Sequence, residues 1–225
     1  MLKVTFFGHS VFLLDNGKER VIIDPWISGN RLATVKAEEL KVDYIVVTHG
    51  HGDHFGDSIE ISKNNNAPIV TVAELSRYCI SKGAKSHGLG IGGSREYPFG
   101  KIKLTIAHHT SSSPDGQYVG VAAGAIITMD SKNVYHCGDT GLFYDMKLIG
   151  EMTPVDLMLV PIGDNYTMGI DDAVKAVELY NPKTVVPMHY NTFPVIKADP
   201  TIFADKVSKI GKKAIILKPG ETIEI

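Results

Sequence analysis

Residues 49–54 read His-Gly-His-Gly-Asp-His and directly follow the apolar run at residues 44–48. The run is typical of a buried strand, so three imidazoles and a carboxylate stand at one strand end. Imidazole nitrogen and carboxylate oxygen suit Zn, Mn, Fe or Ni, and no thiolate lies nearby to favour a softer ion. A polar surface turn is the alternative reading, but clustered titratable groups at a strand end favour a functional site.

The composition places few limits on this interpretation. The chain has 225 residues, of which 44% are hydrophobic and 21% charged, as in ordinary globular proteins. This length fits one large domain, residues 1–225, with a sizeable core. The net charge of -2 indicates no basic surface for nucleic acid or anionic lipid. We therefore expect a small-molecule substrate, with a nucleic-acid partner disfavoured and the basic residues at 206–213 on the solvated face of the last helix.

Three further features concern location and assembly. The first residues read directly as a strand rather than a signal peptide, and no apolar run reaches membrane-spanning length, so we expect a cytoplasmic protein without a membrane partner. Cys79 and Cys137 lie in apolar surroundings and are expected to be small core residues. The oligomeric state stays open, and a homo-oligomer is one option. The loop at residues 29–41 is a candidate lid or contact between copies.

Hydrophobic periodicity and turn residues predict the elements. Strands are expected at residues 2–7, 11–15, 20–24, 44–48, 68–72, 101–107, 119–129, 133–136, 157–161, 183–188, 214–218 and 221–225. Helices are expected at residues 57–64, 74–82, 141–150 and 171–180, with a last one opening at Asp199-Pro200. The glycine-rich stretch at 88–94 is predicted to be a loop or a turn between strands.

The order of these elements predicts the fold. A β-meander is followed by strand–helix units, and the same order then occurs a second time. Such an order favours an α/β protein with two mixed sheets packed face to face and helices outside each sheet, because this layering buries the inner face and one outer face of both sheets.

Four more acidic or imidazole residues follow strand-like runs: Asp24, His109, Asp139 and His189. Loops at strand ends commonly carry catalytic groups on a rigid scaffold. Taken singly, each of these residues is more often structural, satisfying backbone donors. Together with the turn at 49–54, they indicate one shared site.

The ordered set resembles the five signature motifs of the metallo-β-lactamase-fold hydrolases: Asp24, the turn at 49–54, His109, Asp139 and His189. The stretches at residues 8–10, 107–111, 161–169 and 189–194 resemble more narrowly a UPF0173-type branch of metal-dependent hydrolases near the ascorbate-phosphate lactonases. This resemblance spans nearly the whole chain. It implies a four-layer αβ/βα sandwich with a metal site at one edge between the sheets.

The resemblance also implies the ligands of two divalent metal ions, each of which could be Zn, Mn, Fe, Co or Ni. One ion would be held by His49, His51 and His109, and the other by Asp53, His54 and His189. Asp139 would bridge both ions. Asp24 would instead accept a hydrogen bond from a ligand and orient it.

The histidines outside this set need separate interpretation. His108 and His109 are neighbours, and the family spacing selects His109 as the ligand. If the strand continues, alternation turns His108 to the opposite face. His9, His87 and His136 are expected to be structural or exposed rather than ligands.

The expected reaction is hydrolysis of a small ester, lactone or phosphodiester by a metal-bound hydroxide. Asp53 is the candidate catalytic residue; it could be a ligand, a general base or both. An oligonucleotide phosphodiesterase and a non-catalytic metal-binding or sensing protein are the alternatives. Candidate substrate contacts, which could instead hydrogen-bond to ligands, are Thr110, Ser111, Asn165, Thr167 and Tyr190, with Asp164, Tyr166 and Asn191 beside them.

Overall fold

The computed structural model covers residues 1–225 and contains two seven-stranded sheets. The first sheet has the order β14-β1-β2-β3-β4-β5-β6, formed by Thr222–Glu224, Lys3–Phe6, Phe12–Asp15, Arg20–Ile23, Tyr44–Val46, Ile69–Val72 and Ser86–Leu89. Strands β1 to β3 pair antiparallel, whereas β3 to β6 pair parallel. The last strand, β14, returns to pair with β1.

The second sheet repeats this arrangement. Its order is β13-β12-β11-β10-β9-β8-β7, formed by Lys213–Ala214, Thr184–Met188, Leu157–Pro161, Lys132–His136, Ala123–Met129, Gly100–Ile106 and Ser94–Tyr97. Strands β7 to β10 pair antiparallel, and β10 to β13 pair parallel. The predicted order, a meander followed by strand–helix units and then repeated, is therefore confirmed.

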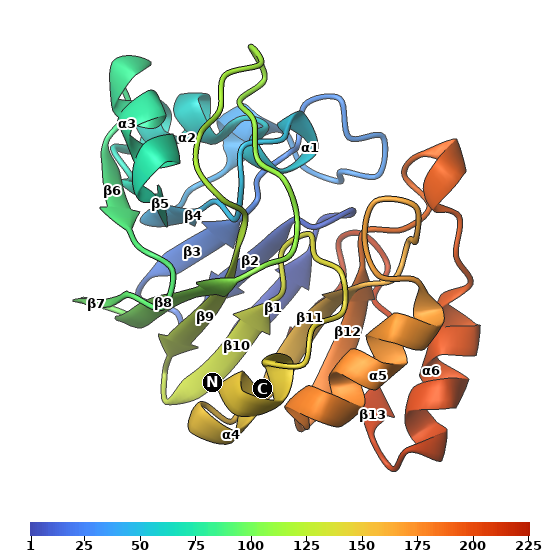
Figure 1. Ribbon diagram of the computed structural model, residues 1–225. Helices are drawn as coiled ribbons and strands as arrows, with labels where there is room; N and C mark the ends of the chain where they lie inside the picture. Colours follow the sequence, from blue (N-terminus) through green and yellow to red (C-terminus); the bar gives the residue numbers. More distant parts are fainter.

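Helices cover the outer faces of the two sheets (Figure 1). On one side lie α1 (Gly52–Phe55), α2 (Ser58–Asn65) and α3 (Ala73–Ser81), and on the other α4 (Met146–Met152), α5 (Ile170–Tyr180) and α6 (Pro200–Lys209). Short 3-10 turns occur at Ala37–Glu39 and Pro194–Ile196. The predicted αβ/βα layering is confirmed. None of the helices has the length and apolar character needed to span a membrane.

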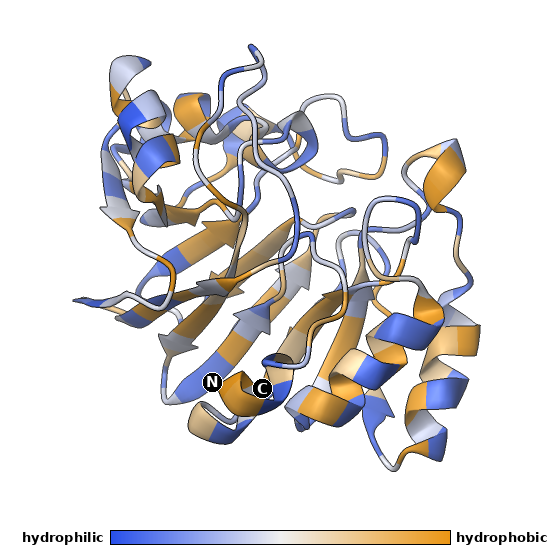
Figure 2. Ribbon diagram, in the orientation of Figure 1, coloured by the Kyte–Doolittle hydropathy of each residue, from blue (hydrophilic) through white to orange (hydrophobic).

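The core lies between the sheets and under the helices, as the apolar strands and two-sided helices of Figure 2 indicate. One cluster of 58 buried hydrophobic residues connects both sheets. Strands β5 and β11 are buried at every position, as expected of strands in a sheet covered on both faces. Cys79 and Cys137 are buried free thiols, which agrees with the expected core role.

Strand direction brings the site residues to one edge. In the first sheet β1, β3 and β4 run in the same direction, and in the second β8, β10 and β12 do so. Parallel strands present their carboxyl ends at a shared edge, where ligands commonly bind. Two backbone hydrogen bonds join the sheets at this edge, from His189 N–H to His9 O at 2.8 Å and from Ala123 N–H to Thr48 O at 3.0 Å.

Several predicted boundaries were wrong. Strand β9 begins at Ala123, not at residue 119, and β13 ends at Ala214, so residues 215–218 are not strand. Helix α4 begins at Met146 instead of 141, because residues 141–145 form the connection that leaves the site. Helix α5 begins at Ile170, one residue before the predicted start at residue 171, and Gly169 is its N-cap.

The stretch at 88–94 contains a turn between strands, which was one of the two predicted options, but the flanking strands β6 and β7 were not themselves predicted. Strand β7 reads Ser-Arg-Glu-Tyr, is largely exposed and lies at the edge of its sheet. An exposed edge strand has no buried face, so it lacks the apolar alternation on which the prediction depended.

Gly100 provides a test of the packing between β8 and β9. Its φ is +140°, and a Cβ built there would lie 2.1 Å from the carbonyl oxygen of Thr128. We expect Gly100→Ala to lower the free energy of unfolding by about 2–4 kcal/mol through strain and overpacking. Gly116, with φ +81° and nothing within 4 Å of a Cβ, is the control, and Gly116→Ala should cost only about 1 kcal/mol. Equal losses in chemical denaturation would contradict this packing.

Candidate metal centre

Seven predicted ligands and one additional histidine converge at the common edge. Three overlapping groups place their ligand atoms within 4.8 Å of one another: His49, His51 and His109; His49, His54 and Asp139; and His9, Asp53, His54 and His189. The members come from both sheets, because they follow β1, β4, β8, β10 and β12. The structure therefore brings together every residue that the sequence analysis assigned to the two metal ions.

The first group consists of three imidazoles that lie close together, two of which, His51 and His109, line the cavity. His49 Nε2 and His51 Nδ1 lie 3.0 Å apart, and the ring of His109 lies 5.1 Å from each of these rings between centroids. His49 is buried, whereas His51 and His109 are half-buried. Three imidazoles arranged in this way can hold one cation from one side and leave its other side open toward the pocket.

Asp24 lies behind two of the predicted ligands, His54 and His49. Its Oδ1 accepts the Thr48 N–H at 2.8 Å, and its Oδ2 accepts the Thr48 hydroxyl at 2.7 Å and His54 Nδ1 at 2.7 Å. Because the Thr48 hydroxyl donates to Asp24, its oxygen is left to accept from His49 Nδ1 at 3.1 Å. The carboxylate thus fixes His54 directly and His49 through Thr48, so that His54 Nε2 lies against Asp139 and His49 Nε2 lies against His51.

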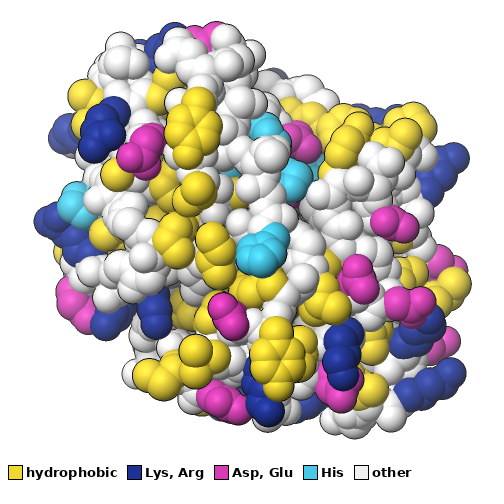
Figure 3. Space-filling view, viewed as in Figure 1, with side chains coloured by type: hydrophobic (Ala, Val, Ile, Leu, Met, Phe, Trp, Pro, Cys, Tyr) yellow, Lys and Arg dark blue, Asp and Glu magenta, His cyan; other side chains and the backbone are white.

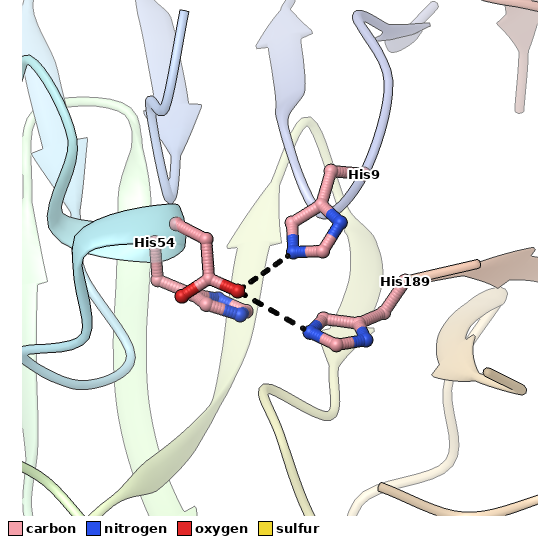
Figure 4. Close-up of side chains that lie close together, drawn as sticks. His9, His54 and His189 are labelled. Carbon is pink, nitrogen blue, oxygen red and sulfur yellow. Dashed lines mark hydrogen bonds and ion pairs between the residues drawn. The ribbon is translucent and has the colours of Figure 1, made fainter. Parts of the chain in front are cut away.

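The second group surrounds the carboxylate of Asp53. Oδ2 of Asp53 lies 3.2 Å from His9 Nε2 and 3.7 Å from His189 Nε2. Figure 4 shows His9, His54 and His189 around this carboxylate, with dashed lines to His9 and His189. Asp53 is about a quarter exposed, while the three histidines are buried. Within this group, Asp53 and His189 line the pocket.

Asp139 lies between the two groups. Its Oδ1 is 3.1 Å from His54 Nε2, and its Oδ2 is 3.1 Å from His189 Nε2 and 3.6 Å from His109 Nε2. It is the one carboxylate with close contacts to imidazoles of both groups. This is the position that a bridging ligand would need.

Burial and charge set the protonation of these groups in opposite directions. Burial, reinforced by His54, holds the pKa of His49 well below its usual value. For His54, burial is outweighed by Asp139 and Asp24, which raise its pKa well above the usual value. The pKa of Asp139 is held well below its usual value because His189 and His54 outweigh the effect of burial. A buried carboxylate that stays ionised among imidazoles is suited to a cation.

A second observation, the lack of hydrogen bonds at several buried nitrogen and oxygen atoms of the site, also indicates that these atoms could coordinate divalent cations. His54 Nε2, Asp139 Oδ1 and both ring nitrogens of His189 are buried and make no hydrogen bond of suitable geometry in the protein, although each Nε2 atom lies 3.1 Å from an oxygen of Asp139. Buried polar atoms are normally satisfied, and a set of orphaned ones calls for an explanation. Because Asp139 and the two histidines converge on one cavity, coordination of a divalent cation by nitrogen and oxygen explains them.

His9 is the member of the site that sequence reasoning missed. It was expected to be structural or exposed, yet it is buried against Asp53 and its ring centroid lies 4.1 Å from that of His189. Burial lowers the pKa of His9 to about 4, so the ring is neutral near pH 7. Because a carboxylate only accepts, His9 Nε2 donates to Asp53, and Nδ1 accepts from the Thr192 hydroxyl at 2.6 Å. In the sequence, the Gly8-His9-Ser10 motif was the feature that could have indicated that His9 belongs to the site.

The remaining histidines lie elsewhere. His108 is exposed and stacks on Phe143 with 4.8 Å between ring centroids. The predicted strand alternation is not the reason that His108 and His109 point in different directions, because β8 ends at Ile106. The two side chains diverge in a bend that follows the strand. His136 is buried and its Nε2 lies 2.9 Å from the Ser10 carbonyl oxygen, whereas His87 contacts Arg95 near the surface. Both fit the predicted structural or exposed roles.

The candidate substrate contacts separate into two sets. Thr110 lines the cavity with five of the predicted ligands. Ser111 does not, because it is buried and its Oγ accepts the Gly50 N–H at 3.1 Å, which supports the histidine turn. Asn165 is exposed, Thr167 is half-buried, and neither lines the cavity. Tyr190 is half-buried and packs on the core.

Two adjoining hollows open at the site. One, of about 310 Å³, is lined by His51, Asp53, His109, Thr110, Asp139, Tyr166 and His189. The other, of about 570 Å³, is lined by Trp26, Gly52, Asp53, Tyr166, Phe193 and Val195. In Figure 3, histidine side chains reach the surface near the upper middle of this face, beside acidic and hydrophobic side chains. Five of the seven predicted ligands therefore line a hollow that a small molecule can enter, whereas His49 and His54 are buried behind them.

Sequence comparisons identify close relatives. Residues 19–190 match the family model described as the Beta-lactamase superfamily domain. A UPF0173 metal-dependent hydrolase of Pelotomaculum thermopropionicum is 50% identical over the full length of both chains. A second UPF0173 metal-dependent hydrolase, from Bacillus cereus, is 49% identical over the same extent.

Solved structures agree with the architecture. Igni18, a metallo hydrolase from Ignicoccus hospitalis, is 42% identical and superimposes with a TM-score of 0.92, covering 100% of this chain and 99% of its own. The metallo-β-lactamase fold protein YhfI from Bacillus subtilis is 16% identical, with a TM-score of 0.77 and coverage of 100% and 99%. The second similarity concerns the fold alone.

The two neighbouring histidines provide a matched test of the ligand assignment. We expect His109→Ala to lose bound metal, because its ring faces His49 and His51, and we expect His108→Ala to keep it. Metal content is measured by elemental analysis after reconstitution and removal of free ions. Equal losses in both variants, or a loss confined to His108→Ala, would contradict the assignment.

Asp24 can be tested with an isosteric change. Asp24→Asn keeps the shape and tolerates the observed φ of +47°, but its amide brings donors where Asp24 accepts from Thr48 and His54. We expect metal affinity about 10–100-fold weaker, as is typical for residues that orient a ligand. Competition with a chelator measures this. Complete loss of one ion with normal folding would indicate direct ligation by Asp24, and unchanged affinity would exclude the orienting role.

Proposed function

Because the chain belongs to the β-lactamase superfamily and, within it, to the UPF0173 metal-dependent hydrolases, we propose that this metal-dependent hydrolase cleaves a small ester, lactone or phosphodiester at two divalent cations. The observation that carries this proposal is the cluster of buried, unpartnered ligand atoms around Asp139, open to a cavity on one side. A small molecule is the partner that a hollow of about 310 Å³ suits.

The residues of the site would have separate roles in this reaction. His49, His51 and His109 would hold one cation, Asp53, His54 and His189 the other, and Asp139 would contact both. When bound, such cations lower the pKa of a coordinated water toward neutrality and polarise the bond to be cleaved. Asp24 and Thr48 hold two of the ligand rings in fixed orientations, so little reorganisation is needed when substrate binds.

Asp53 is the residue placed to move a proton. Its Oδ2 is held by the buried His9, and the residue lines both hollows. We infer that Asp53 is a ligand and can also accept the proton of the attacking water, then deliver it to the leaving group. His9 positions this carboxylate through Nε2, while Thr192 fixes the tautomer of the His9 ring.

The lining argues against an oligonucleotide substrate. No lysine or arginine lines either hollow at the site. Proteins that bind single strands combine a positively charged groove with stacking platforms. A compact substrate with one scissile bond therefore suits the site better than a polyanion. The other alternative, a metal sensor, differs from a hydrolase in that it turns over no substrate.

Metal removal tests the proposed reaction. We expect the chelated protein to turn over none of a set of thioesters, lactones and bis-p-nitrophenyl phosphate, and activity on at least one class to return in proportion to bound metal. Asp139→Asn should lower kcat/KM by more than the about 10–100-fold typical of an orienting residue. Asp145→Asn, the same change at an exposed position, is the control. Activity that survives chelation, or full metal binding without turnover of any class or of short RNA, would contradict the proposal.

A further inference from the structure

The larger hollow beside the metal centre has an apolar wall that the proposed hydrolysis does not use. Trp26 and Phe193 stack with ring centroids 5.5 Å apart and an angle of 21° between planes. Tyr166 and Val195 complete the lining, and their exposed fractions are 57% and 55%. Large apolar side chains that remain exposed around one hollow, rather than packing into the core, mark a binding site.

This wall is continuous with the metal centre. Asp53 and Tyr166 line both hollows. The ring of His9, which hydrogen-bonds to Asp53, meets Trp26 edge-on at 5.1 Å and Phe193 at 5.6 Å between centroids. A molecule whose reacting group lies at Asp53 would therefore extend over the Trp26–Phe193 pair.

The loop that carries Tyr166 is shaped to present it. Asp164 and Asn165 both have left-handed backbones, with φ of 59° and 55°, and the Asn165 N–H donates to Asp164 Oδ1 at 2.8 Å. Two consecutive residues in this conformation hold the ring of Tyr166 out over the site instead of against the core. Backbone conformations of this kind cluster at ligand-binding sites.

The chemistry of the hollow selects against charge. It contains no lysine or arginine, and its one ionisable carboxylate belongs to Asp53. A carboxylate or phosphate placed there would lose water without gaining a cationic side chain as partner and would face Asp53. A planar apolar group would instead stack on the Trp26–Phe193 pair, which is the arrangement that aromatic faces prefer.

We propose that the hollow formed by Trp26, Tyr166, Phe193 and Val195 is a substrate subsite for an uncharged planar apolar group, such as a phenyl ring, attached to the acyl side of the scissile bond. This inference rests on the proposed function, because it assigns the substrate class of the same site. The preferred substrate is then a neutral aryl-bearing acyl derivative and not a phosphorylated or carboxylated one.

Binding of matched amides tests the subsite without turnover. The probes are N-methyl hydrocinnamamide, which is neutral and aromatic, and N-methyl succinamate, which is anionic and of similar length. Trp26 is the single tryptophan of the chain, so its fluorescence and its shielding from acrylamide report occupancy. We expect the metal-loaded protein to bind the aromatic amide at least about tenfold more tightly. Equal affinities, or binding that leaves Trp26 unchanged, would overturn the proposal.

Val195→Lys places a cation in the hollow at an exposed position, and Val121→Lys is the control at a valine that is 44% exposed and lines neither hollow. We expect Val195→Lys to reduce the preference for the aromatic amide at least about tenfold, and Val121→Lys to leave it unchanged. Light scattering is measured in parallel. If Val195→Lys leaves the preference for the aromatic amide intact, the hollow is not a substrate subsite. The same conclusion follows if light scattering shows that the parent protein is a dimer and that Val195→Lys makes it a monomer, because the hollow is then a contact between copies.

Turnover separates this inference from the proposed function. The methyl thioesters of hydrocinnamic, acetic and succinic acids share one leaving group, and water adds to the acyl carbon as methanethiol departs with a proton. We expect kcat/KM to be highest for the hydrocinnamic thioester, by about tenfold. Failure to cleave any thioester, with the amide preference intact, would contradict thioester hydrolysis alone. Cleavage of all three at equal rates would contradict the subsite alone.

Discussion

The buried carboxylate of Asp24 is the interaction on which the site depends. It accepts three hydrogen bonds, from two groups of Thr48 and from His54, and it is fully buried. Burying a charge is costly unless it is paired and hydrogen-bonded, so this carboxylate holds its donors in one arrangement. Through His54 and Thr48 it sets a ring orientation in each of the two ligand groups.

The backbone makes this arrangement possible. Asp24 leaves β3 with a φ of +47°, and His9 and His189 leave β1 and β12 with φ of 57° and 55°. These residues turn the chain away from the sheets just where the strands end, so that side chains of both sheets meet. The hydrogen bond from His189 N–H to His9 O then ties the two sheets together at the cluster. The fold and the site are coupled at the same few residues.

The sequence predicted most of the architecture because hydrophobic period and strand order are local properties. The meander and the strand–helix units could be predicted in this way. The convergence of Asp24, His109, Asp139 and His189 with the histidine turn was predicted instead from their positions after strands and from the resemblance to the metallo-β-lactamase-fold hydrolases. Strand β7 escaped because it is an exposed edge strand with no buried face. Helix α4 was placed too early because no periodicity separates it from the connection after Asp139.

The parts of the site that were not predicted depend on contacts between distant residues. Neither the burial of His9 against Asp53 nor its bond to Thr192 follows from a single histidine in a turn. Ser111 was expected either to contact substrate or to hydrogen-bond to ligands, and its hydroxyl instead accepts the N–H of Gly50, 61 residues earlier in the histidine turn. The hollow beside Trp26 likewise unites residues 26, 166 and 193, which no local pattern connects.

The central claim is that this cluster holds two divalent cations, one in each ligand group, with Asp139 between them. The most direct measurement is anomalous diffraction at the absorption edge of the metal, from crystals of the chain reconstituted with Zn or Mn. We expect two peaks, one among His49, His51 and His109 and one among Asp53, His54 and His189, each also beside Asp139. A single peak, a peak coordinated by Asp24, or metal bound away from this edge of the sheets would contradict this claim.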